Sequence, residues 1–422
     1  MKKLVLTTVS AAALMIGAPA LAQQTSDIDQ IGADNSATVD QTGGNEGVSD
    51  IDQDGDDNVA EVTQSENPNA GSPTFSVPAN KATIDQDGDN SRARVTQNST
   101  NPGGQSNVAT ITQSSSYDPS NSGTDSTVPS GFANNARVIQ DGEDNQSTIS
   151  QTDGNPGGLT GAAAYNSQEG SGHRSTIIQN QLGSGAEFDP DSRVDVFQSG
   201  TDNTSDVLQR RQANGLIIDQ SGSGNSSDAE QQKQSNTGSV TQSGVGNVST
   251  FFQNQDSNGT VMQSGDNNNS DLSQSNNSVA FVDQIGNNGT SVVNQGGSEN
   301  NADVTQTAGS TFANSDIQQT GTNGDATVTQ GGDSNHSDII QSGNAQTASL
   351  IQFGFNNDSL ITQEDGVGSG GNTASVEQSG DNNMSDVFQS GTGNTADVTQ
   401  ASNLNVSDVS QTGSGNTATV NQ

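Results

Sequence analysis

Glutamine and asparagine side chains recur along this chain at a fixed spacing, and their chemistry is the most direct clue in the sequence. Near the C-terminus, Gln378, Gln389 and Gln400 follow one another at intervals of 11 residues, and an asparagine lies five residues after most glutamines. A primary amide both donates and accepts hydrogen bonds, so identical amides stacked above one another can form a continuous ladder. The spacing therefore predicts a stack of repeats.

The pattern Q-x4-N-x5-Q defines the residues that we expect in this ladder. Their amides should point inward and stabilise the stack through hydrogen bonds between successive repeats. The predicted ladder residues are Gln30, Asn35, Gln41, Gln53, Asn58, Gln64, Gln140, Asn145, Gln151, Gln198, Asn203, Gln209, Asn214, Gln220, Asn225, Gln231, Gln378, Asn383, Gln389, Asn394, Gln400, Asn405, Gln411, Asn416 and Gln422.

Residues suited to catalysis or metal binding are scarce. The chain has two histidines, which we assign to a loop (His173) and to an outward strand position (His336), and it has no cysteine. A catalytic triad or a zinc site needs several such groups close together, so we predict neither enzymatic activity nor a cofactor. The calcium-binding nonapeptide G-G-x-G-x-D is also missing, which leaves only loose cation binding by the aspartate rows as an alternative.

The segment Asn394–Gln400 shows the element that must carry the amides. In a β-strand, Asn394, Ala396, Val398 and Gln400 share one face, while the residues between them are polar or charged. Such alternation is typical of a half-buried strand. The glycine and asparagine that follow most glutamines suit a tight turn.

A second, longer period is superposed on the 11-residue spacing. Ser-Asp pairs mark alternate units, so that Asp206 and Asp228, or Asp386 and Asp408, are 22 residues apart. We therefore predict an all-β fold: a flattened β-solenoid of strand-turn-strand repeats, with about 22 residues per coil and two facing parallel sheets, cross-β or amyloid-like when assembled. One coil cannot fold alone, because ordering it costs roughly 20–40 kcal/mol and its few aliphatic side chains return about 1.5–3 kcal/mol each.

The N-terminus predicts export. Lys2 and Lys3 precede an apolar stretch, and Ala20–Ala22 form an A-x-A site, so residues 1–22 are predicted to be a signal peptide cleaved after Ala22. A membrane anchor is the less favoured alternative, because the apolar run is shorter than the ~20 residues that a spanning helix needs. No later segment is apolar enough to span a membrane, and a net charge of −38 disfavours nucleic acid as a partner.

The remaining chain divides into two parts by regularity. Residues 23–193 are predicted to be repeats with Pro-, Gly- and Ser-rich loop insertions, and residues 194–422 to be regular repeats. Proline cannot donate to a sheet ladder, so the interruptions are predicted to be loops that bulge from the column. They are Ser65–Ala82, Asn98–Ser106, Ser114–Ala133, Thr152–Arg174 and Asn180–Asp191.

The unit S-x5-Q-x-G-x2-N-x-A-x3-Q resembles the curlin repeat of bacterial curli, and the segment Gln30–Gln41 shows it from its first glutamine onward. The resemblance covers almost the whole chain after residue 22. It implies a secreted subunit of functional-amyloid fibres, located at the cell surface of a Gram-negative-type bacterium and used in adhesion and biofilm matrix. Its implied partners are other copies of the chain, a nucleator subunit and an outer-membrane secretion channel with accessory proteins.

The ends of the repeat array favour polymerisation. The first unit begins at Ser26 and the last ends at Gln422, which leaves no room for the capping segments that solenoids need, and we expect head-to-tail assembly. Stacked aspartates should oppose it, so acid, salt or divalent cations should speed it. The alternative function is a monomeric secreted β-solenoid that acts as an adhesin or another binding module.

Overall fold

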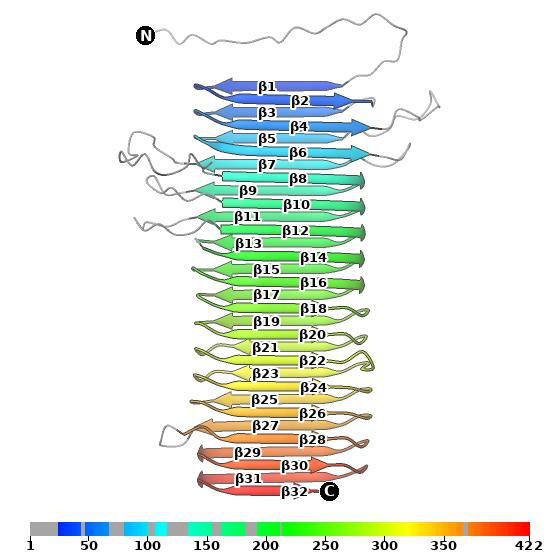
Figure 1. Ribbon diagram of the computed structural model, residues 1–422, viewed down its shortest axis with the longest axis vertical. Helices are drawn as coiled ribbons and strands as arrows, with labels where there is room; N and C mark the ends of the chain where they lie inside the picture. Colours follow the sequence, from blue (N-terminus) through cyan, green and yellow to red (C-terminus); the bar gives the residue numbers. More distant parts are fainter. Residues whose placement is uncertain are drawn as a thin grey trace, which may run out of the picture.

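The computed structural model describes residues 24–43, 47–66, 80–99, 106–115, 134–153, 162–181, 192–211, 213–365 and 370–422. Every regular element in these ranges is a β-strand, and the strands stack into one straight column (Figure 1). The predicted all-β solenoid with two parallel sheets is therefore confirmed. The predicted signal peptide and the prolines that follow it lie outside the described residues.

Odd-numbered strands form one sheet of 16 strands, called sheet A, and even-numbered strands form a second sheet of 16, called sheet B. Neighbouring strands within each sheet are parallel. Sheet A comprises β1 (Thr25–Ile31), β3 (Val48–Asp54), β5 (Lys81–Asp87), β7 (Val108–Ser115), β9 (Gln146–Asp153), β11 (Arg174–Gln181), β13 (Thr204–Arg210), β15 (Ser226–Gln232), β17 (Val248–Asn254), β19 (Asn269–Ser275), β21 (Thr290–Gln295), β23 (Asn314–Gln319), β25 (His336–Ser342), β27 (Asp358–Asp365), β29 (Met384–Thr392) and β31 (Val406–Ser414).

Sheet B strands run in the opposite direction to those of sheet A, and one strand of each sheet makes a coil (Figure 1). Sheet B comprises β2 (Ser36–Thr42), β4 (Val59–Glu66), β6 (Ser91–Ser99), β8 (Asn134–Glu143), β10 (Ala162–Ser171), β12 (Ser192–Thr201), β14 (Gly215–Ser223), β16 (Thr237–Val245), β18 (Asn258–Gln263), β20 (Val279–Gln284), β22 (Asn301–Gln306), β24 (Asp325–Gln330), β26 (Thr347–Gln352), β28 (Thr373–Gln378), β30 (Thr395–Gln400) and β32 (Thr417–Asn421).

The core lies between the two sheets and repeats from coil to coil. In β25, Ser337, Ile339 and Gln341 point inward and are buried, because side chains alternate along a strand. The equivalent inward residues of β24 are Ala326 and Val328, followed by a glutamine. Each inward residue stacks on its counterpart in the next coil, so the core is a set of straight rows.

The turns hold these rows in register. Gly222 has a φ of 99°, and a Cβ atom there would lie 2.1 Å from the carbonyl oxygen of Gly244 in the next coil. Only glycine fits this close approach between stacked turns. The residue just before the turn asparagine also adopts positive φ, as in Asp202 (55°) and Asn382 (57°), where Asp and Asn are better tolerated than most residues.

The number of residues per coil varies, although the inward residues stay in register from coil to coil. The step between stacked glutamines is 22 residues for Gln198 and Gln220, as the period predicts, but 43 residues for Gln97 and Gln140. The extra residues are inserted between strands and leave the register unchanged. One loop assignment was wrong: the stretch Thr152–Arg174 contains β10, which pairs with β8 and β12 along its length.

Candidate functional site

Two continuous glutamine ladders run the length of the column, one in each sheet. In sheet B, the Nε2 atom of Gln198 donates to Oε1 of Gln220 at 2.9 Å, and Gln220 donates in turn to Gln242 at 2.8 Å. The same link joins every neighbouring pair of strands in both sheets, and the donor is always in the coil nearer the N-terminus. Both ladders are therefore directional.

Each ladder glutamine also ties the two sheets together. The second hydrogen of the Gln220 Nε2 group bonds the carbonyl oxygen of Thr204 in sheet A at 2.8 Å, and Gln389 reaches Thr373 of sheet B at 3.0 Å. Both amide hydrogens are thus used inside the core, where an unmade hydrogen bond is costly.

The turn asparagines link successive coils in a different way. The Oδ1 atom of Asn394 accepts the backbone N–H of Asn416 at 3.0 Å, and its Nδ2 atom donates to the carbonyl oxygen of Gly413 at 3.0 Å. Both contacts are made to the following coil, so an asparagine satisfies backbone groups that the tight turn leaves unpaired.

His173 occupies one of these asparagine positions, between β10 and β11. Its Nε2–H donates to the carbonyl oxygen of Glu169 at 3.0 Å, and its Nδ1 atom accepts the backbone N–H of Asn203 at 3.3 Å. The ring is fully buried. The imidazole therefore takes the place of the asparagine amide. His173 lies outside the strands, in the tight turn between β10 and β11.

The structure places the predicted ladder residues in these rows. Most are fully buried, whereas Gln30, Asn416 and Gln422 are exposed because they lie in the first and last coils. The sequence prediction omitted other ladder members, including Gln168 and Gln179 on either side of His173. Their signal is Q-x4-H-x5-Q, which is the repeat with one substitution.

The inward residues of sheet A include a row of buried serines. The Oγ atoms of this row have no hydrogen-bond partner among the described residues. Sheet B carries mostly alanine at the matching position. The serine row comprises Ser49, Ser175, Ser205, Ser227, Ser249, Ser270, Ser291, Ser315, Ser337, Ser359, Ser385 and Ser407.

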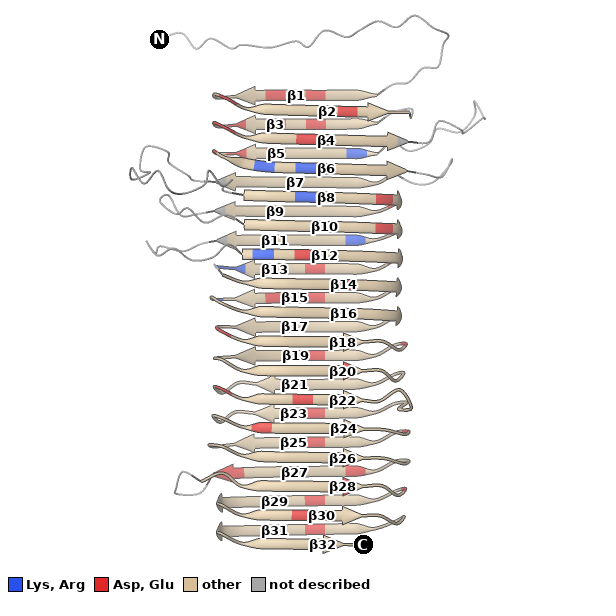
Figure 2. Ribbon diagram, viewed as in Figure 1, with Lys and Arg blue, Asp and Glu red and all other residues tan. Residues whose placement is uncertain are grey.

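Charged groups lie on the outer faces of the column (Figure 2). Asp316 stacks on Asp338, and burial followed by the neighbouring carboxylate raises the pKa of Asp316. Uncharged residues such as Val292 and Leu360 then interrupt this aspartate row, so it never exceeds two consecutive members in sheet A.

His336 lies at the outer face of β25, with its Nδ1 atom 2.9 Å from Asp358 Oδ1 and its Nε2 atom 3.5 Å from Asp338 Oδ1. Within the described ranges, no group of three or more His, Cys, Asp or Glu side chains is arranged to hold a metal ion. The part of the chain with described coordinates also contains no helix that is long and apolar enough to cross a membrane.

The two ends of the column present matching groups. Among the described residues, the outer edges of β1 and β2 at one end, and of β31 and β32 at the other, pair with no strand. Gln30 and Gln41 have Oε1 atoms that accept no ladder bond there. At the opposite end, Gln411 and Gln422 donate only to backbone carbonyl oxygens, with no further glutamine to bond.

Comparison with known proteins agrees with this geometry. The family model of the curlin associated repeat matches residues 332–364, 371–401 and 391–422. The predicted resemblance to curlin repeats is thereby confirmed for the C-terminal end of the chain. No curated protein matches the chain significantly.

Proposed function

We propose that this curlin-repeat protein is a structural subunit that assembles head to tail into an extracellular, curli-like amyloid fibre. The observation that carries the proposal is the chemical match between the two ends of the column. A β-solenoid built of curlin repeats points to a structural protein rather than an enzyme.

The amides of the two ends are complementary. Gln411 and Gln422 offer Nε2 donors at one end, while Gln30 and Gln41 offer Oε1 acceptors at the other. If β1 of a second copy follows β31, each glutamine ladder continues without a change of direction. The ladder residues then have the same role between subunits that they have between coils.

The strands that would meet at this junction also have the same pattern. The segment Thr417–Gln422 reads TATVNQ and the segment Ser36–Gln41 reads SATVDQ, so alanine would stack on alanine and valine on valine. Uncovered parallel edges with matching inward residues are templates for further strands. A fibre made this way is one continuous solenoid.

Export and cellular role belong to the proposal as well. The proposed signal peptide, cleaved after Ala22, would carry the chain out of the cytoplasm. In line with the curlin repeat, we propose a fibre at the bacterial surface that serves adhesion and biofilm matrix, with a nucleator subunit and an outer-membrane channel as further partners.

The test is assembly of the exported chain, residues 23–422, after transfer from denaturant. We expect fibres with a diffraction spacing of about 4.7–4.8 Å along their axis, because the strands lie perpendicular to it. A chain that stays a folded monomer for days at high concentration would overturn the proposal and favour a monomeric adhesin.

A variant of the terminal strand makes the test specific. The first backbone N–H of each sheet A strand donates to the next coil, as Met384 does to Asn405 at 2.8 Å, so the N–H of Val406 points out of the column. Val406→Pro removes this outward donor without breaking an internal bond. We expect it to fold but to stop elongation, whereas the control Val406→Thr should elongate normally.

A further inference from the structure

The lysines and arginines of the column are gathered in its first half. Apart from Lys2 and Lys3, all of them lie between Lys81 and Lys233. On the outer face of sheet B, Arg92 and Arg94 of β6 lie beside Arg137 of β8, because Arg94 and Arg137 are register partners. Arg94 forms an ion pair with Glu61 at 2.6 Å and stays partly exposed. Arg92, Arg94 and Arg137 thus bring three positive charges together on neighbouring strands.

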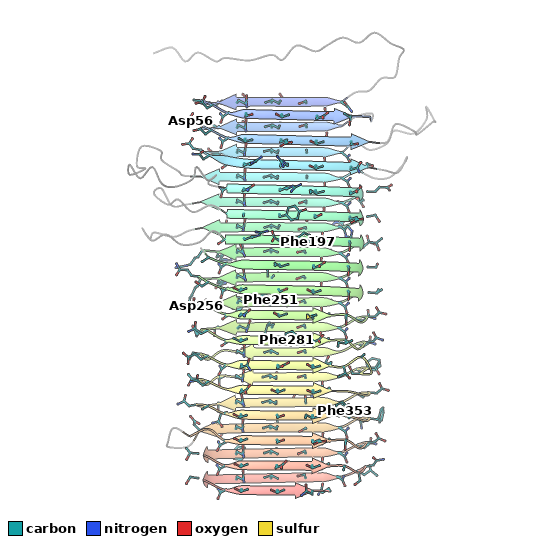
Figure 3. All side chains as sticks on the ribbon, viewed as in Figure 1. Asp56, Phe197, Phe251, Asp256, Phe281 and Phe353 are labelled. Atoms are coloured by element: carbon teal, nitrogen blue, oxygen red, sulfur yellow. The ribbon has the colours of Figure 1, made fainter. Side chains whose placement is uncertain are left out.

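Aromatic side chains continue the same face. The guanidinium of Arg137 lies 5.5 Å from the ring centroid of Tyr165, and Tyr165 lies 5.4 Å from the ring of Phe197 in the next strand. Phe197 is 38% exposed, and its position on β12 is labelled in Figure 3. Contiguous arginine and aromatic side chains are typical of protein interfaces. We call Arg92, Arg94, Arg137, Tyr165 and Phe197 the Arg–aromatic patch.

The opposite face of the same part of the column is acidic. The outer face of β1, β3 and β5 in sheet A carries seven exposed aspartates and one lysine, Lys81 (Figure 2). We call these aspartates the acidic patch. They are Asp27, Asp29, Asp50, Asp52, Asp54, Asp85 and Asp87.

Beyond the acidic patch, the outer face of sheet A is uncharged on β7 and then mixes apolar with charged residues, among them Arg174 of β11 and Asp206 of β13. The outer face of β7 carries Thr110 and Thr112, and further on Ile178 of β11 and Leu208 of β13 are half-buried. Ile178 lies in the same coil as Phe197, and Leu208 in the same coil as Ile217, which is 48% exposed. The basic groups on sheet B thus have acidic counterparts on sheet A, and its aromatic and apolar groups have counterparts that are small or partly apolar.

We propose that the Arg–aromatic patch docks on the acidic patch of a second column, so that fibres associate side by side with sheet B of one against sheet A of the next. Arg92 is near the start of β6, and Asp54 and Asp87 end β3 and β5. Because the two sheets run in opposite directions, these residues lie on the same side of the column. Two columns that point the same way can therefore meet with a shift of no more than one coil.

The proposed occupant is a second copy, since the surface that complements the patch is on the chain itself. This inference rests on the proposed function but makes a separate claim, because elongation uses strand edges and docking uses sheet faces. Elongation supplies many patches along one fibre, so weak single contacts add up through multivalency.

The test compares side-by-side association of full-length exported chains at physiological salt, by electron microscopy of fibre width and by low-speed pelleting. Arg92→Thr/Arg94→Thr/Arg137→Thr should yield single columns. The control Arg174→Thr/Arg211→Asn/Lys233→Asn removes the same number of charges outside the patch and should bundle like wild type. Equal bundling by both triple variants would overturn the docking proposal.

A variant of the acidic patch distinguishes docking between complementary patches from an effect of the overall charge repulsion between columns. Asp50→Thr/Asp52→Thr/Asp85→Thr lowers the net negative charge, which by itself would promote bundling. We expect it to lose bundles, and tighter bundles would overturn the proposal. Arginine-dependent coating of single wild-type fibres by alginate, without bundling, would identify an anionic polymer as the occupant instead. Wild-type chains that form no fibres would count against the proposed function and not specifically against this docking.

Discussion

At the residue scale, the column depends on turn side chains that both donate and accept hydrogen bonds, because backbone groups of the tight turns need these partners. An asparagine meets this requirement in most turns, and His173 meets it in one, through Nε2–H and Nδ1. The imidazole differs from the amide in one respect, because it can take up a proton. A protonated Nδ1 would face the N–H of Asn203 as a second donor and break that link.

His173 therefore makes the column sensitive to mild acid. Burial lowers the pKa of its imidazole, although Asp202 acts in the opposite direction. The unfolded chain binds a proton near pH 6.5 that the folded chain excludes, so stability should fall as pH decreases through this value, by at most about 1.4 kcal/mol per pH unit.

Urea unfolding of the monomeric column between pH 7.5 and pH 5.5 measures this effect. His173→Asn restores the usual amide and should flatten the dependence. Identical pH profiles for wild type and His173→Asn would contradict the assignment.

The serine row predicts a core substitution that stabilises the column, whereas most core substitutions destabilise a protein. The buried Oγ atom of Ser337 has no partner, and an unsatisfied hydroxyl costs about 1–3 kcal/mol. Alanine fits the matching position in sheet B, so Ser337→Ala should raise the free energy of unfolding by about 1 kcal/mol. Ser342→Ala, at an outward position of the same strand, serves as the control in urea titrations. A loss of stability in Ser337→Ala alone would show that the hydroxyl has a partner.

At the element scale, the unit is a five- to ten-residue strand and a tight turn. The period of the glutamines predicted these elements and their two faces, because alternation and turn chemistry are local properties of the sequence. It failed for β10, where Gln168 and Gln179 flank a histidine in place of asparagine. It also could not show the serine hydroxyls to be unpaired, since that depends on the distance between facing sheets.

One element shows how facing strands compensate each other. Phe251 of β17 is the only phenylalanine in the buried core of the described residues, and it faces glycine in place of alanine in sheet B (Figure 3). A Cβ atom at Gly238 would lie 2.7 Å from the Phe251 ring, and one at Gly259 would lie 2.9 Å from it. The glycines therefore make room for the ring.

A double-mutant cycle tests this coupling. Gly238→Ala should destabilise the column by about 1–3 kcal/mol, as overpacked cores do. In a Phe251→Val background the same change should cost less, because the contact with the ring is gone and only that with Leu216 Cδ1 at 2.9 Å remains. Gly215→Ala, whose added Cβ would meet nothing within 4 Å, is the matched control. Equal effects of Gly238→Ala in both backgrounds would rule out the coupling.

At the scale of the whole molecule, the order of the aspartates distinguishes the proposed junction from the interior. In the row of sheet A that contains Asp386 and Asp408, stacked aspartates occur at most in pairs. The first coils present Asp27 and Asp50 in the same row. Head-to-tail contact would bring these pairs together into a run of four carboxylates, which occurs nowhere inside the described column.

Elongation should therefore depend on pH more than folding does. Burial and the neighbouring Asp408 already raise the pKa of Asp386, so protonation on acidification favours the stacked form. In Asp408→Ser, the loss of one repulsive contact of about 0.9 kcal/mol should speed elongation at neutral pH by roughly fivefold at most.

Seeded growth measured from pH 8 to pH 4 checks this expectation. Asp408→Ser should show a smaller acceleration by acid than wild type, whereas Asp271→Ser, at an isolated aspartate inside the column, should keep the wild-type response. Growth rates that do not change with pH in wild type would contradict the electrostatic account of the junction.

The common direction of the two glutamine ladders gives the column an electrical asymmetry. Backbone hydrogen bonds between parallel strands alternate in direction and largely cancel, but the amide dipoles of the two glutamine ladders all align, with oxygen toward β1 and β2 and N–H toward β31 and β32. Such an array places partial negative charge at one tip and partial positive charge at the other, as in a helix macrodipole. Small anions should therefore favour the tip formed by β31 and β32, and a fibre should retain this difference however long it grows.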